Sequence, residues 1–129
     1  MIKGEGHNPE TCKGPINSVK DALYVLSGKW KLLLMVALAQ GPMRFKDLQR
    51  ALIDITPKML SKELRELELN DMIERKVFNT VPVTITYELT EYSDTVQPVI
   101  EALKNWGEQH RERLVKTRRT EPAEAEVLT

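Results

Sequence analysis

The side chains best suited to binding another molecule lie on one face of the segment from Pro57 to Leu69. On a helical wheel, four hydrogen-bond donors gather on this face: Lys58, Ser61, Lys62 and Arg65. Lysine and arginine bind phosphate oxygens, while serine and arginine also reach the edges of nucleic-acid bases. The acids of the segment fall to the margins of this basic face: Glu63, Glu66 and Glu68. The face therefore has the chemistry of a polyanion-binding surface.

The charge of the whole chain gives no support for such binding. Lysine and arginine number 19, aspartate and glutamate also number 19, and the pI is about 6.7. A lysine- and glutamate-rich helix face is often only a solvated surface. The face alone leaves both interpretations open, and binding to a polyanion would depend on local sorting of charge.

The opposite face of the same segment is apolar. Leu60, Leu64 and Leu67 fall within about 60° of one another on the wheel and are expected to face the core. Thr56 is a suitable N-cap, and Pro57 suits the first helical position. We therefore predict a helix over residues 57–69, whose N-terminus also favours negatively charged groups.

The flanking pattern predicts the elements that position this helix. Apolar periodicity predicts helices over residues 15–26, 29–40 and 44–52, with the second one buried. Residues 72–79 and 84–90 read as a hairpin, and the second strand alternates like a half-buried strand. A long helix from Thr90 to Thr117 follows, with a kink expected at Pro98. This order predicts a mainly α fold with a small β-hairpin wing, a winged helix-turn-helix.

That context favours double-stranded DNA as the polyanion. Residues on the third helix and on the hairpin are suitable for phosphates and for a minor-groove edge. The candidate DNA-binding residues are Arg44, Lys46, Thr56, Pro57, Lys58, Ser61, Lys62, Arg65, Lys76, Asn79 and Thr80. A winged-helix domain used as a protein-interaction module remains the alternative function, and steep salt dependence of binding would distinguish DNA from it.

The terminal helices carry apolar stripes that a small domain does not need for its own core. The predicted interface residues are Ile16, Val19, Leu23, Leu103, Trp106 and His110. A contiguous exposed apolar patch usually marks an interface, so we expect a homodimer. The alternative is that these helices pack only on their own domain. A two-fold dimer would place the two copies of the predicted helix 57–69 roughly 34 Å apart, one turn of DNA.

The 129 residues are expected to form one domain over residues 15–117, with a flexible arm at 1–14 and a disordered tail at 118–129. The single cysteine, Cys12, cannot form an internal disulfide. Lys13 and the following helix start favour its thiolate, so oxidant sensing is one interpretation and an unreactive thiol is the other. The spacing of His7, Cys12 and His110 matches no ligand motif, and no metal or cofactor is predicted.

Other function classes lack support. The sequence has no glycine-rich phosphate loop, nucleophile elbow or metal-ligand pair at helical spacing, so we predict that the chain is not an enzyme. No apolar run is long enough to span a bilayer, and the first residues lack the apolar core of a secretion signal. We therefore expect a cytoplasmic location and no membrane partner.

Five segments of the chain carry a family pattern: "CKGPI", "LSGKWKLLLMVALAQGPMRFKDLQRAL", "ITPKMLSKELRELELNDMIERKVF", "VPVTITYELT" and "VQPVIEALKNWGEQ". Together they resemble the motifs of the HxlR-type bacterial transcriptional regulators, within the MarR-like superfamily. A glycine is common in that family after the recognition helix, where this chain has Asn70-Asp71. Asn70 is expected to take the left-handed conformation there.

The resemblance implies a function as well as a fold. It implies a homodimer on near-palindromic promoter DNA, commonly a repressor, with the helix 57–69 in the major groove. The hairpin tip at 78–84 would reach the minor groove, and helices 16–26 and 96–114 would build the dimer. Cys12 matches an N-terminal cysteine that senses electrophiles or oxidants in some members. No effector is identified by these motifs.

Overall fold

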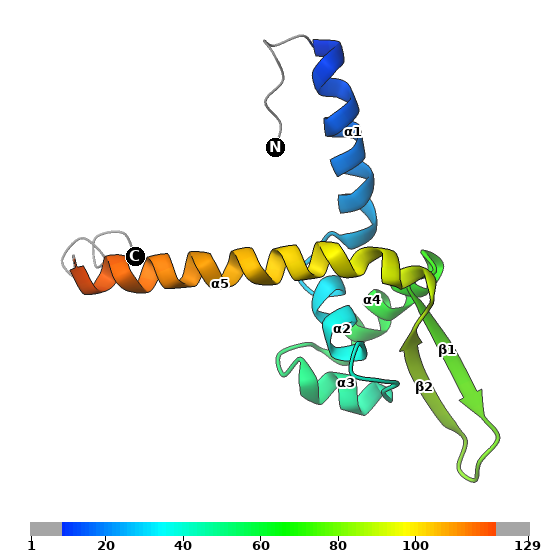
Figure 1. Ribbon diagram of the computed structural model, residues 1–129. Helices are drawn as coiled ribbons and strands as arrows, with labels where there is room; N and C mark the ends of the chain where they lie inside the picture. The colour runs from blue at the N-terminus through cyan, green and yellow to red at the C-terminus, as the bar shows by residue number, and fades with distance from the viewer. Residues whose placement is uncertain (1–8, 121–129) are drawn as a thin grey trace. The chain divides into compact units, whose positions relative to one another are not determined.

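The computed structural model describes the backbone of residues 9–120 and the side chains of residues 13–118 (Figure 1). The elements follow one another as α1 (Pro9–Leu26), α2 (Lys31–Leu38), α3 (Phe45–Ala51), α4 (Pro57–Leu69), β1 (Ile73–Phe78), β2 (Thr84–Leu89), η1 (Tyr92–Val96) and α5 (Gln97–Thr120). The predicted mainly helical fold with a hairpin wing is confirmed. None of the described helices is both long and apolar enough to cross a membrane.

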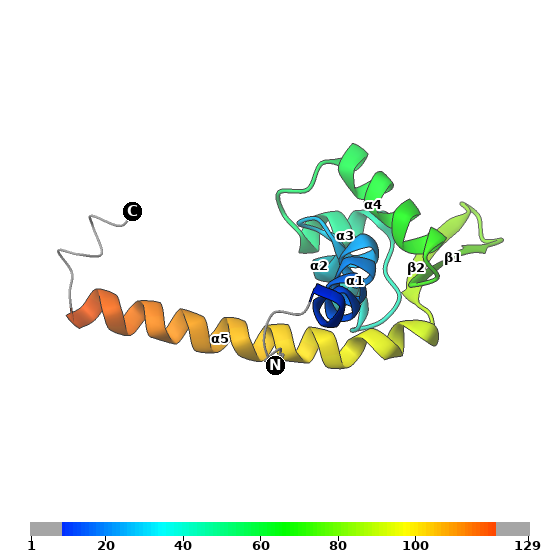
Figure 2. The ribbon, with the colours of Figure 1, turned by 90° about the horizontal axis from the view of Figure 1, so that it is seen from above.

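The core of the winged-helix unit lies among α2, α3, α4 and the start of β1. Figures 1 and 2 show these three helices gathered beside the strand pair. The large apolar side chains with almost no exposure are Leu34, Met35, Leu48, Leu60, Leu64, Leu67 and Ile73. Each such burial stabilises the fold by roughly 1.5–3 kcal/mol relative to an exposed side chain. The three α4 leucines face the core as predicted, so the opposite face of α4 is turned to solvent.

The wing is an antiparallel pair whose register runs from Ile73 opposite Leu89 to Phe78 opposite Thr84. Its base is tied to the α2–α3 connection, because Met43 and Tyr87 exchange two backbone hydrogen bonds of 3.0 and 2.8 Å. The predicted burial alternation of β2 is wrong, since all six of its residues are half-buried. In the described part of the chain the sheet has two strands of six residues each, and most of their residues are exposed or half-buried.

The first helix begins at Pro9 and not at Pro15, so residues 9–14 of the expected arm are helical. Pro15 is the seventh residue of α1, beyond the first four whose N–H groups have no partner within the helix, so one backbone hydrogen bond of α1 is missing there. Residues 1–8 lie outside the described part of the chain. At the other end, residues 118–120 of the expected tail are helical, and 121–129 lie outside it.

The approach to the last helix also differs from the prediction. Thr90 does act as a cap, because its Oγ1 accepts a hydrogen bond from the Ser93 backbone N–H at 3.2 Å. The segment that it caps is the 3-10 turn η1, and α5 starts only at Gln97. Pro98 therefore lies in the first turn of α5, where proline is favoured, and is not the site of a mid-helix kink. A second compact unit begins at Asp94.

The second helix is shorter and less completely buried than expected. It spans Lys31–Leu38, and Gly41, at φ +140°, follows its end as predicted. Within the winged-helix unit, Leu33 and Val36 remain 45 % and 47 % exposed. The expectation of burial all round is wrong because α3 and α4 cover only the face that carries Leu34, Met35 and Leu38. That face also carries a buried charge, Lys31.

The turn after α4 places its left-handed residue one position later than expected. Asp71 has φ +60°, whereas Asn70 has φ −98°. The Asn70 side chain instead donates to the Glu66 carbonyl at 2.9 Å and closes the last turn of the helix. Asp71 is a tolerable choice at that position, because its short polar side chain reduces the cost of the left-handed conformation.

Candidate nucleic-acid interface

The recognition helix α4 begins as the sequence predicts, with Thr56 as its N-cap. The Oγ1 of Thr56 accepts a hydrogen bond of 3.1 Å from the backbone N–H of Met59, and Pro57 is the first helical residue. The cap satisfies one of the N–H groups that the first turn leaves free. Pro57 has no N–H to satisfy. The start of the helix is thus fixed by short-range chemistry alone.

The predicted basic face is present on the exposed side of α4. All of its polar members are exposed, and they surround one shallow surface hollow together with Met59 and Glu66: Thr56, Lys58, Ser61, Lys62 and Arg65. Arginine, lysine and hydroxyl donors thus converge on one open surface, which can accept a phosphate backbone and base edges.

The acids of α4 do not all lie at the margin. Glu63 is only 6 % exposed, and the expectation that it flanks the basic face as a solvated acid is wrong. Its Oε2 lies 2.8 Å from the Nζ of Lys31 on α2, and Oε1 of Glu66 lies 3.0 Å from the same nitrogen. The Ser27 carbonyl is the third acceptor, at 3.5 Å. The ammonium has three N–H donors, and each of them has a partner.

We call Lys31, Glu63 and Glu66 the Lys31 cluster. Burial lowers the pKa of Lys31, but the hydrogen bonds to the two glutamates outweigh burial and raise that pKa above its ordinary value. The pKa of Glu66 is lowered, chiefly by its hydrogen bond to Lys31. Lys31 and Glu66 are therefore both charged at neutral pH. Gly28 has φ +97°, and a Cβ added at this position would lie 4.0 Å from Oε2 of Glu63.

The third helix contributes a second basic region. Arg44 is the N-cap of α3, and its side chain is 65 % exposed with Nε 3.6 Å from Oδ2 of Asp47. The same carboxylate faces Arg50 at 3.6 Å through its other oxygen. Lys46 is exposed and borders a shallow hollow with Gln49, Arg50 and Ile53. One aspartate thus orients two arginines and neutralises them only in part.

The wing holds the remaining predicted contacts. Lys76 forms an ion pair across the strands with Glu88, whose hydrogen bond raises the pKa of Lys76. In the loop, the Thr80 hydroxyl contacts the Pro82 carbonyl at 2.6 Å and the Thr84 hydroxyl at 2.8 Å. Thr80 therefore stiffens the loop, and Asn79 beside it is exposed. The ammonium of Lys76 is less available to phosphate than the sequence suggested.

Comparison with known proteins decides the family. Residues 25–115 match the HxlR-like helix-turn-helix family, a span that contains α2–α4, the wing and most of α5. The chain belongs to the HxlR-like family. It is therefore a helix-turn-helix transcriptional regulator and not an enzyme, as predicted.

Relatives of this HxlR-like protein include regulators that have been solved in different redox states. An uncharacterized regulator of Bacillus subtilis, YdeP, is 38% identical over 109 residues, which cover 84% of this chain and 85% of YdeP. The redox regulator HypR in its reduced form is 37% identical with a TM-score of 0.72, over 77% of this chain and 98% of HypR.

A third relative is YodB of B. subtilis, whose reduced form is 35% identical with a TM-score of 0.65, over 71% of this chain and 90% of that one. YodB has also been solved after diamide treatment and bound to quinone.

The structure adds three sets of residues to the candidate interface of this HxlR-like protein that the sequence did not predict. Gln49 and Arg50 border the α3 hollow, and their spacing of three and four residues from Lys46 was an available signal. Met59 lines the α4 hollow between Lys58 and Ser61. Lys31 had no sequence signal, because its partners are 32 and 35 positions away.

The predicted dimer residues are exposed within their own units. Ile16, Val19 and Leu23 on α1 are 56 %, 51 % and 56 % exposed. On α5, Leu103 and Trp106 are 50 % and 61 % exposed. The Trp106 and His110 rings stack at 4.9 Å between centroids, with planes 7° apart. His110 is thus paired with an aromatic ring on its own helix.

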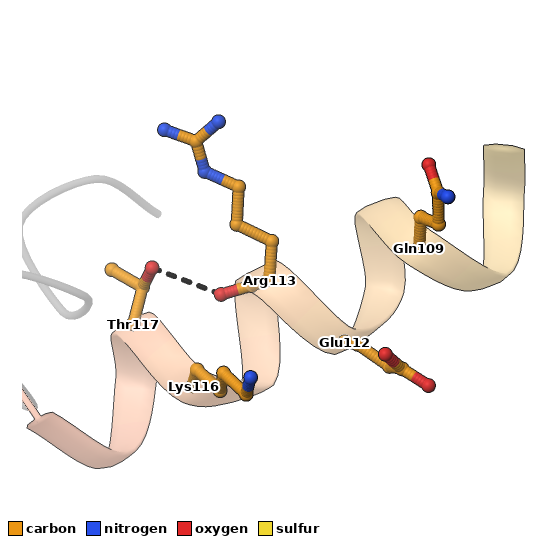
Figure 3. Close-up of a pocket in the computed structure, with 5 residues that line it drawn as sticks. All are labelled: Gln109, Glu112, Arg113, Lys116 and Thr117. Atoms are coloured by element: carbon orange, nitrogen blue, oxygen red, sulfur yellow. Dashed lines mark hydrogen bonds between the residues drawn. The ribbon is translucent and has the colours of Figure 1, made fainter.

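The α5 helix also bears a group of polar side chains that forms no enclosed site. Figure 3 shows the residues involved projecting from a single helix in different directions: Gln109, Glu112, Arg113, Lys116 and Thr117. The Thr117 hydroxyl donates to the Arg113 carbonyl at 2.9 Å. One helix cannot surround a ligand, so we assign no binding function to this group. The side chains of His7 and Cys12 lie outside the described residues.

Proposed function

We propose that this HxlR-like protein binds near-palindromic promoter DNA sequence-specifically as a homodimer and represses transcription. The basic face of α4 would enter the major groove, and the wing from Phe78 to Thr84 would follow the minor groove. The observation that carries this proposal is the convergence of exposed donors on one hollow of α4, Thr56, Lys58, Ser61, Lys62 and Arg65.

The assembly part of the proposal is supported by the apolar residues of α1 and α5. Leu103, Trp106 and Leu114 keep 45–61 % of their surface exposed in the described chain. Exposed apolar side chains in a row along a helix are typical of an interface. A second copy of this chain would cover them, and would bring a second α4 to the other half of a palindromic site.

Cys12 is the proposed oxidant-responsive residue. It is the fourth residue of α1, where the N-terminus of the helix favours the thiolate. Two Cys12 thiols, one from each protomer, could join in a disulfide with two electrons passing to the oxidant and two protons to water. A mixed disulfide with a small thiol is the other product available to a chain with one cysteine.

Selection of bound sequences from a random DNA pool, with and without diamide, tests the proposal. We expect a palindromic consensus from the reduced protein and weaker or altered selection from the oxidised protein. The matched control is Cys12→Ser, which should select the same consensus in both conditions. Absence of any consensus, with binding that is insensitive to salt, would instead favour a protein-interaction module. An equal response to diamide in the wild type and in Cys12→Ser would exclude Cys12 as the oxidant-responsive residue.

A further inference from the structure

The acid that matters most for the charge of the candidate interface is Glu66. It lines the same hollow as Lys58, Ser61, Lys62 and Arg65, and its side chain is 37 % exposed. A carboxylate at this surface repels a phosphate backbone. The Coulomb field of Lys62 also acts on Glu66 and helps to keep it ionised. The basic face thus contains a permanent negative charge.

The counter-charge to Glu66 comes from beneath α4. The Nζ of Lys31 lies 3.0 Å from Glu66 and 2.8 Å from Glu63, and the residue is only 5 % exposed. Lys31 is therefore too deeply buried to reach a phosphate itself. One ammonium set against two carboxylates leaves the Lys31 cluster with one net negative charge.

We propose that Lys31 acts on DNA binding through Glu63 and Glu66, because its ammonium offsets their charge against the DNA, while Glu66 limits affinity. This inference rests on the proposed DNA-binding function. Without Lys31, Glu66 would be free to pair with Lys62 and withdraw that ammonium from phosphate. The carboxylate of Glu66 would then lie at the basic face of α4 without its counter-charge.

Two single substitutions act in opposite directions. We expect Lys31→Met, which keeps a long apolar stem, to weaken binding about tenfold at low salt. Glu66→Gln should strengthen binding about fivefold, because the remaining Lys31–Glu63 pair is neutral. Both differences should shrink as salt rises, since screening acts on charge and not on packing. A gain in affinity cannot result from partial unfolding, so Glu66→Gln tests the effect of the Glu66 charge even if Lys31→Met folds poorly.

A double substitution separates charge from structure. Lys31→Met combined with Glu66→Gln restores the wild-type net charge while removing both of the ion pairs that join Lys31 to α4. We expect its affinity to return to within about twofold of wild type. If Lys31 acted only by holding α4 in place, the double variant would bind no better than Lys31→Met. Glu68→Gln is the matched control, since it removes the same charge from an exposed acid of α4 that does not line the hollow.

The measurement is the dissociation constant at several salt concentrations, on a long random-sequence DNA duplex and on the selected duplex. Circular dichroism checks that each variant is folded. If Glu66→Gln binds equally or more weakly than wild type while wild type shows a steep salt slope, this inference is overturned. A changed base preference in Glu66→Gln would likewise overturn it, by making Glu66 a base reader. A flat salt slope for wild type would instead overturn the proposed DNA binding.

Discussion

At the scale of single residues, the candidate DNA interface combines side chains held by local hydrogen bonds with exposed side chains that can change rotamer. Thr56 is held by its own helix, and Thr80 by the wing loop. Lys58, Lys62 and Arg65 project from α4 into solvent. The free side chains lose rotamer entropy when they bind, so the rigid helix that carries them must present them already grouped.

Lys62 and Arg65 should have separable effects on binding. Lys62→Ala removes a phosphate contact and should weaken binding to all sequences, with a salt slope smaller by about one. Arg65→Ala should change base preference at one position by about 1–3 kcal/mol, because arginine binds a guanine edge through two donors. Binding to the selected site and to single-base variants measures both effects. An unchanged preference in Arg65→Ala would exclude a base-reading role.

Ile53 occupies a strained conformation in the turn between α3 and α4. Its φ is +42°, which is unusual for a β-branched residue, and its side chain is 81 % exposed. Ile53→Gly should relieve strain of about 1–2 kcal/mol, of which glycine flexibility in the unfolded chain returns a part. We expect a net gain of about 0.5–1 kcal/mol in the free energy of unfolding by urea titration. Ile53→Ala is the control, and a gain as large as that of glycine would exclude strain as the cause.

At the scale of elements, α4 is joined to its neighbours in two ways. Its leucines pack on the core, while Glu63 and Glu66 bond to Lys31 of α2. The leucine contacts are insensitive to pH, whereas the ion pairs depend on it. The stability of the α2–α4 connection therefore depends partly on pH.

Acid should weaken the α2–α4 connection. The pKa of Glu66 is lowered from 4.5 in the folded protein, so its contribution to stability is present above that pH and is lost as pH falls through the folded value. The raised pKa of Lys31 places the corresponding alkaline loss above 10.5. We expect Glu66→Gln to lose less thermal stability than wild type between pH 7 and about pH 3. Glu68→Gln should behave like wild type, and equal losses in all three proteins would contradict this role of Glu66.

At the scale of the whole molecule, the chain forms two compact units, each with its own kind of exposed surface. The unit that ends at Ser93 presents the candidate DNA interface, and the unit that begins at Asp94 presents an exposed apolar helix. Reading a palindrome requires two copies of the first, so the proposed function depends on what α1 and α5 do in solution.

Disruption of the α5 apolar row should reduce assembly and DNA binding together. We expect Leu103→Asp to shift sedimentation toward the monomer and to lower affinity for the palindromic site at least tenfold, because each monomer then binds one half-site. Trp106→Ala should have a smaller effect in the same direction. Glu101→Gln, on the same helix, is the control. A dimer that is unchanged in Leu103→Asp would exclude this interface.

The sequence by itself determined most of the features that rest on short-range chemistry. The start of α4 at Pro57, its cap and its apolar face followed from residue order, because helix periodicity and capping act over a few positions. The hairpin and the exposed basic face followed in the same way. The extension of α1 back to Pro9 has no such signal, because Pro15 is itself typical of a helix start.

Only the tertiary structure decided what depends on contacts between distant positions. The wheel placed Glu63 and Glu66 beside solvent, but α2 brings Lys31 to them across more than 30 positions of the chain. Ion pairing over that separation has no local pattern, because it arises only when two helices pack. The sequence thus specified which side chains share a face of α4, and packing determined how much charge that face can offer to DNA.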